Sequence, residues 1–163
     1  MKKLFLLILS ISFLLSSCER DDICAESTPT TPLLVIDFFD ADNPSEEKIP
    51  TDLLIVEEGS DQGLIFTTSS ISIPLRTDVD QTRFNFVLNF ESEDADNPQN
   101  VDLVVFNYLR QEEYISKACG FRVTYQAIQD EFLPGVDNAW IDNITILNTT
   151  IEDETETHIR IFH

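Results

Sequence analysis

Residues 83–90 alternate between large apolar side chains and mostly polar ones. The apolar residues occupy every second position, and they are Phe84, Phe86, Leu88 and Phe90. Successive side chains of an extended strand point to opposite faces of a sheet, so this period of two places all four on one face. The segment therefore predicts a β-strand with one face buried in an apolar core.

Further segments have the composition of strands. Residues 70–75 and 121–127 alternate in the same way, and Pro74 favours an edge strand or a strand end because proline has no N–H for the ladder. Other runs are apolar on both faces and rich in Val, Ile, Leu and Phe, as is typical of central strands. These runs are residues 33–39, 53–56, 64–67 and 103–109. Two further C-terminal segments, residues 141–147 and 158–162, complete the set of expected strands.

No stretch carries a helical apolar stripe over three turns. Residues 111–117 leave room either for one short helical turn or for a continuation of the strand before them. About eight or nine short strands between turns predict an all-β domain, specifically a two-sheet antiparallel β-sandwich of the immunoglobulin-like kind. A small β-barrel is the alternative.

The N-terminus has the pattern of an export signal. Two lysines precede an apolar run from Leu4 to Leu15. A positive start before a short apolar run is typical of a secretory signal peptide, and a run of about 12 residues is shorter than the ~20 that a membrane-spanning helix needs. We expect residues 1–17 to be a signal peptide, residues 18–31 a lipidated polar tether and residues 32–163 a single domain.

A cysteine follows the apolar run directly. Leu15, Ser16, Ser17 and Cys18 resemble the lipobox of bacterial lipoproteins at all four positions. The small residues suit a signal peptidase, and the thiol behind them is available for acylation. The resemblance implies that Cys18 carries a lipid and that the membrane is a partner through this anchor.

Charged residues come next. Arg20, Asp21 and Asp22 are similar to the surface-export signal of Bacteroidetes lipoproteins, in which a basic residue and then acids follow the acylated cysteine. This similarity implies an outer-membrane anchor with the protein facing outward. The alternative is a polar tether without a sorting role, on a protein that faces the periplasm.

The chain is strongly acidic. It has 30 acidic and 10 basic residues in 163, a net charge of −20 at pH 7. Such a balance repels nucleic acid and anionic headgroups, so we expect no nucleic-acid partner. A well-solvated surface accounts for most of these acids.

Two cysteines remain besides Cys18. Cys24 and Cys119 form an even pair in a chain expected to enter an oxidising compartment, and we predict that they form a disulfide rather than two free thiols. Neither has Cys-x-x-Cys spacing or a histidine nearby in sequence, so neither has the features of a catalytic cysteine.

The pentapeptide Asp-Ala-Asp-Asn-Pro occurs twice, at residues 40–44 and 94–98. Its carboxylate and amide oxygens are ligands of the kind that calcium uses. The same residues are also those that turns need, and neither copy has the glycine and glutamate of an EF-hand. We expect no cofactor, and the weak calcium candidates are Asp40, Asp42, Asp94 and Asp96.

No catalytic signature is present. The sequence has no Gly-x-Ser-x-Gly elbow, no His-Glu-x-x-His and no phosphate-binding glycine loop. An acidic turn at residues 152–156 is interpreted as a solvated loop, and His158 and His163 lack the further ligands of a zinc site. We therefore expect no enzymatic activity.

The large aromatic residues allow two interpretations. Trp140, Tyr108, Tyr114 and Tyr125 would form a platform for sugars if they were exposed. A core tryptophan is the alternative, because large aromatic side chains dominate sandwich cores.

Three segments resemble an uncharacterised lipoprotein family of Bacteroidetes: residues 18–24, residues 28–32 and residues 116–121. The resemblance covers nearly the whole mature chain. It assigns no activity and no functional residues, but it supports the envelope compartment and the pairing of the two cysteines. We expect a non-enzymatic accessory or interaction module at the outer membrane, bound to another envelope protein, with a glycan-binding surface module as the alternative.

Overall fold

The structure is a computed structural model that describes residues 23–135 and 138–163. Within these ranges it consists of strands and connections, and no helix long and apolar enough to cross a membrane occurs there. The strands are β1 (Leu34–Phe39), β2 (Leu53–Glu57), β3 (Gly63–Phe66), β4 (Ser70–Ile73), β5 (Gln81–Leu88), β6 (Asn100–Ser116), β7 (Gly120–Leu133), β8 (Asn143–Ile146) and β9 (Ile159–Phe162).

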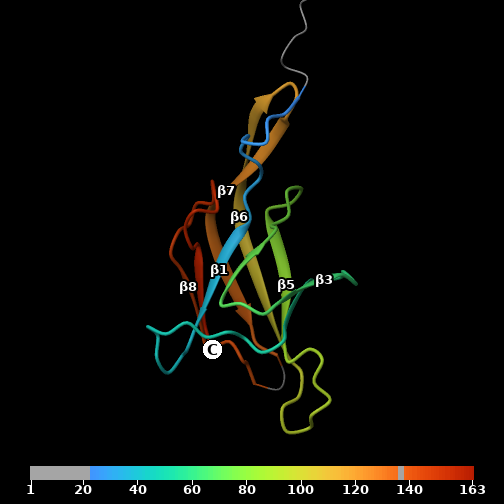
Figure 1. Ribbon diagram of the computed structural model, residues 1–163, viewed down its shortest axis with the longest axis vertical. Helices are drawn as coiled ribbons and strands as arrows, with labels where there is room; N and C mark the ends of the chain where they lie inside the picture. The colour runs from blue at the N-terminus through green and yellow to red at the C-terminus, as the bar shows by residue number, and fades with distance from the viewer. Residues whose placement is uncertain (1–22, 136–137) are drawn as a thin grey trace, which may run out of the picture. The chain divides into compact units, whose positions relative to one another are not determined.

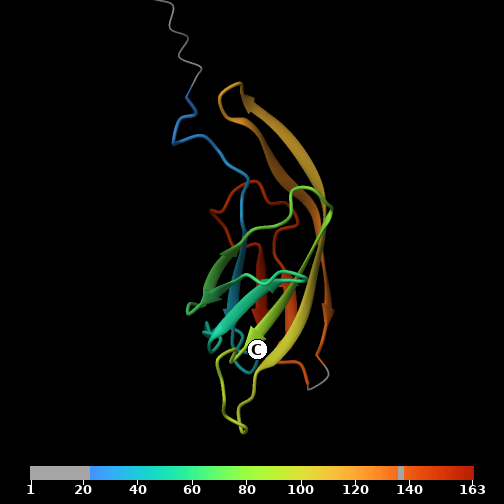
Figure 2. The same ribbon diagram turned by 90° about the vertical axis from the view of Figure 1, so that its right-hand side faces the viewer.

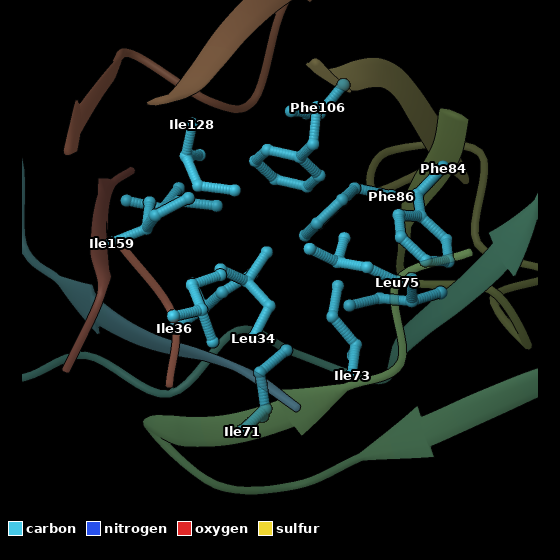
Figure 3. Packing of buried hydrophobic residues seen from close by; sticks show 14 of the residues in the cluster. Leu34, Ile36, Ile71, Ile73, Leu75, Phe84, Phe86, Phe106, Ile128 and Ile159 are labelled. Atoms are coloured by element: carbon cyan, nitrogen blue, oxygen red, sulfur yellow. The ribbon is translucent and has the colours of Figure 1, made fainter. Parts of the chain in front are cut away.

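The strands form two sheets, in the orders β4-β1-β9-β8 and β3-β2-β5-β6-β7 (Figures 1 and 2). The sheets are not closed on themselves, so the predicted two-sheet sandwich is confirmed and the barrel alternative is wrong. Apolar side chains from both sheets point toward one another between the layers (Figure 3). Burying one such Leu, Ile or Phe side chain stabilises the fold by about 1.5–3 kcal/mol.

The strand order corrects the immunoglobulin-like expectation in two respects. First, β1 and β9 are parallel, with Ile36 opposite Ile159, so the sandwich is not wholly antiparallel. Second, β1 and β2 lie in different sheets, whereas an immunoglobulin constant domain places its first two strands side by side. A hydrophobic pattern fixes which face of a strand is buried but not which strand lies beside it.

The predicted alternation is observed only as far as Phe86, because Val87 is also buried, Leu88 is half-buried and β5 ends there. Phe84 and Phe86 are buried, and Asn85 between them is half-buried. Asn89 adopts a positive φ of 53°, which takes the backbone out of the extended conformation before Phe90.

Residues 111–116 continue β6 as a strand, so the helical-turn alternative is wrong. The hairpin between β6 and β7 closes where the hydroxyl of Ser116 accepts a hydrogen bond from the Cys119 N–H at 3.1 Å. Gly120 follows with a φ of +73°, a conformation that glycine adopts at little energetic cost.

The chain divides into two compact units, which are described separately. The sandwich comprises residues 29–113 and 122–163. The second unit, here called the tip, comprises the end of the β6–β7 hairpin, residues 114–121, together with the N-terminal segment, of which residues 23–28 are described.

Candidate interaction site

β3 and β4 are edge strands of different sheets within the sandwich. A groove of about 320 Å³ opens between β3, at the end of one sheet, and the end of β4 in the other. We call it the edge groove. Its lining is largely apolar with a polar rim, and it comprises Ile55, Glu57, Ser60, Gln62, Gly63, Leu64, Ile73, Pro74 and Phe84.

The register of β3 explains why the groove is apolar. Leu64 lies opposite Ile55, and residues directly opposite in an antiparallel pair share a face of the sheet. Ile55 is buried on the inner face, yet Leu64 beside it is 47% exposed. Among the described residues, the other sheet therefore covers this inner-face side chain of β3 only in part.

The outer edge of β3 has no neighbouring strand among the described residues. An edge strand presents unpaired N–H and C=O groups to which another strand can bind, and many proteins protect such edges with charges, proline or bulges. The sequence of β3, Gly-Leu-Ile-Phe, has none of these features, and Ile65 is 59% exposed. The edge is thus open to pairing.

Gly63 allows β3 to approach β2 closely. A Cβ atom at this position would lie 2.6 Å from Leu54 Cδ1, 2.6 Å from Val56 Cγ2 and 2.9 Å from the carbonyl oxygen of Ile55. Any other residue would push β3 away from its only partner in the described chain, so the shape of the groove depends on this glycine.

A family model matches residues 49–163, which is more than half of the chain. The chain belongs to the DUF6452 family. This is a family of unknown function. No curated protein and no solved structure matches the chain. The region matched by DUF6452 contains the whole edge groove. It begins after β1, so the match leaves out one strand of the sheet, the one between β4 and β9.

The expected anchor and export residues of this DUF6452 chain, Cys18, Arg20, Asp21 and Asp22, lie outside the described residues. The predicted disulfide is confirmed within the tip. Cys24 and Cys119 are bonded, with their Cα atoms 4.9 Å apart.

The repeated pentapeptide forms turns. The Asp40 carboxylate accepts hydrogen bonds from the N–H groups of Asp42 at 2.8 Å and Asn43 at 3.2 Å, and Asp94 accepts one from Asp96 at 2.9 Å. The Asp42 N–H bond is the main cause of the lowered pKa of Asp40. Over residues 23–135 and 138–163 no group of three metal-ligating side chains forms. The hydrogen bonds of Asp40 and Asp94 to the backbone are the turn role that the sequence offered as an alternative for these residues.

The two histidines of the DUF6452 chain occupy different environments. His158 is buried, and its Nδ1 accepts the N–H of Val35 at 2.9 Å. It lines a polar hollow of about 300 Å³ together with residues of the acidic turn. His163 instead places Nε2 3.3 Å from the carbonyl oxygen of Lys48 and packs edge-on against Trp140.

The proposed sugar platform is wrong for three of its four residues. Trp140, Tyr108 and Tyr125 are 9% exposed or less, so their ring faces cannot stack on a ligand. The indole Nε1 donates a hydrogen bond to the carbonyl of Phe86 at 3.1 Å, which fixes Trp140 as a core residue. Tyr114, in the tip, is 58% exposed.

Sequence reasoning missed the edge groove and one buried carboxylate. Asp102 is fully buried on β6 and accepts three backbone N–H bonds. A signal for the groove was available in the short apolar run 63–66, which has no charged residue. Its position at a sheet edge could not be inferred without the strand order.

Proposed function

We propose that this chain is a lipid-anchored protein of the bacterial outer membrane whose sandwich binds an extended segment of another envelope protein at the edge groove. It acts as a non-enzymatic interaction module. The observation that carries the binding proposal is the open β3 edge beside an apolar groove.

The anchor rests on sequence. The four lipobox positions ending at Cys18 support lipidation, and Arg20 with the two following aspartates supports an outward-facing position. The disulfide between Cys24 and Cys119 agrees with this compartment, because such bonds persist mainly in oxidising environments outside the cytoplasm.

The binding mode is strand addition. An extended partner segment would form main-chain hydrogen bonds with the free edge of β3, and every second side chain would point into the groove beside Leu64, Ile73 and Phe84. The backbone contacts would provide affinity, and the groove would select apolar side chains at alternate positions of the segment.

The negative charge of this chain indicates which charged residues the partner segment carries. Glu57 lies at the rim of the groove, where its carboxylate also pairs with Arg76 at 3.5 Å, and the chain as a whole has a net charge of −20. Opposite charges across an interface speed association and fix register. The segment we propose therefore combines alternating apolar residues with Lys or Arg at its ends.

The test is site-specific photo-crosslinking of the full-length lipidated protein in native envelopes. The crosslinker benzoylphenylalanine replaces Ile65 in one protein and Leu147 in a matched control. Leu147 is 47% exposed against 59% for Ile65, but it lies neither on β3 nor in the groove. A supporting result is an adduct from position 65 whose linked peptide, identified by mass spectrometry, has alternating apolar residues with basic ends.

A second change in the same protein makes the test specific. Leu64→Lys places a charge in the groove and should abolish the adduct from position 65. Adducts only with phospholipid or with a second copy of the chain would contradict the proposal, as would equal labelling from position 147.

A further inference from the structure

The tip exposes large apolar side chains. Ile23 is 84% exposed, Tyr114 is 58% exposed and Phe121 is 66% exposed. The rings of Tyr114 and Phe121 pack edge-on, with centroids 5.2 Å apart, so each ring supports the other while both face solvent. Clustered exposed apolar side chains mark sites of protein or membrane contact.

The disulfide joins this surface to the segment that follows the expected anchor. Ile23 is the neighbour of Cys24, and Phe121 lies two residues after Cys119, so the bond holds both at one end of the hairpin. Six steps along the chain separate Cys18 from Cys24. Fully extended, they span at most about 22 Å at ~3.6 Å a step. A lipid on Cys18 would thus keep the tip close to the membrane surface.

The charge of the tip differs from that of the chain as a whole. The chain has three acids for each base, but residues 114–121 contain no acid and one base, Lys117, which is exposed. An acidic surface is repelled by lipid phosphates, whereas a lysine among aromatic residues is attracted to them. The hairpin end of the tip therefore lacks the negative charge that would oppose contact. In the N-terminal segment of the tip, the exposed Glu26 is the one acid among the described residues, and Glu19, Asp21 and Asp22 lie closer to the expected anchor in sequence.

Tyrosine is enriched at membrane–water interfaces, because its ring is apolar and its hydroxyl remains hydrated at the level of the headgroups. We propose that the tip is a membrane-contacting surface, in which Tyr114, Phe121 and Ile23 enter the headgroup region of a phospholipid bilayer and Lys117 pairs with lipid phosphate. This inference rests on the proposed lipid anchor. It goes beyond that anchor, since it makes the tip a second point of attachment that limits rotation of the tip about the lipid.

The test uses the full-length, disulfide-bonded protein purified from native envelopes and reconstituted with vesicles of phosphatidylcholine and phosphatidylethanolamine with brominated acyl chains. Phe121→Trp places a fluorescent ring in the tip, and Leu109→Trp is the matched control in the sandwich. Leu109 is 61% exposed against 66% for Phe121, and both residues lie on strands of the same hairpin. The buried Trp140 contributes equally to both proteins and is subtracted with the unsubstituted protein.

The expected result is loss of emission by bromine quenching from position 121 and unchanged emission from position 109. Floatation with the vesicles separates the two proposals. If the protein purified from native envelopes does not float, the anchor itself is refuted. If the protein floats but Trp at position 121 is not quenched, or if its emission changes only with protein concentration as in self-association, the membrane-contacting tip is refuted.

Discussion

The Nδ1 atom of His158 accepts a hydrogen bond from the backbone N–H of Val35 at 2.9 Å, and the backbone N–H of His158 donates to the carbonyl of Val35 at 3.0 Å. These two hydrogen bonds continue the parallel pairing of β1 with β9, because Val35 precedes Ile36 and His158 precedes Ile159, its partner in the register. Because Nδ1 accepts, the imidazole must be neutral with its proton on Nε2. Burial is the main cause that holds the pKa of His158 below 6.5, and a hydrogen bond to the Asp153 backbone opposes it.

Acid should therefore destabilise the sandwich in a definite pH window. Between the lowered pKa of folded His158 and 6.5, the unfolded chain binds more protons than the folded one, so the free energy of unfolding falls as pH falls through this window. His163, whose pKa is also lowered mainly by burial, acts in the same direction. Each histidine contributes a slope of up to about 1.4 kcal/mol per pH unit. Urea unfolding between pH 7.5 and 5 measures it.

The control variant is His158→Asn, whose side-chain oxygen can accept the Val35 N–H without titrating. It should reduce the pH slope while leaving the contribution of His163, although its smaller volume lowers stability at every pH. An unchanged slope in His158→Asn would contradict the role of the neutral imidazole. Asp40, Glu58, Asp78 and Asp153 also have lowered pKa values, but they act below about pH 4.5.

Asp102 should be essential for the connection between β7 and β8. Its carboxylate accepts the N–H groups of Gly135 at 3.0 Å, Trp140 at 2.9 Å and Ile141 at 3.0 Å. Asp102→Ala leaves buried donors without partners and should lower the free energy of unfolding by about 3–5 kcal/mol. Asp102→Asn keeps the shape and one acceptor oxygen, so its loss should be smaller. Equal stability of Asp102→Ala and the unsubstituted protein in urea titrations would refute this role.

The local fold could be predicted from residues such as Phe84 and Phe86, because a period of two is an intrinsic property of extended chain. The strand order could not. β1 and β9, paired in parallel, are separated by most of the chain, and no local pattern records that contact. The buried Asp102 was missed for a related reason, since its three donors lie more than 30 residues away in sequence. In contrast, the pairing of Cys24 with Cys119 was predictable because few alternatives existed.

Cys18 should carry the lipid. Radiolabelled palmitate should enter the unsubstituted protein and be absent from Cys18→Ala, because the thiol is the acceptor of the acyl chain. Cys18→Ala should also be released from the membrane fraction. Label in Cys18→Ala, or its retention in membranes after a high-salt wash, would contradict the assignment.

Arg20, Asp21 and Asp22 should direct the protein to the cell surface. Protease added to intact cells should remove the domain of the unsubstituted protein but not that of the Asp21→Ala, Asp22→Ala double variant, which keeps the lipid. A periplasmic protein that stays intact shows that the cells are sealed. Protection of the unsubstituted protein under the same conditions would support the periplasm-facing alternative.

The disulfide should contribute strongly to stability. Cys24 and Cys119 are 95 residues apart, and β1 to β6 lie between them. In the chain-entropy model, closing a loop of about 100 residues in the unfolded state contributes up to about 4.7 kcal/mol. Cys24→Ser and Cys119→Ser should each lower Tm by several degrees, and the double variant should be no less stable than either single one, because one bond is lost in all three. Thermal unfolding of the mature protein, with and without reductant, measures these differences. Additive losses in the double variant would show that the side chains act independently of the bond, and freely alkylated thiols in protein taken from the envelope would show that the bond does not form there.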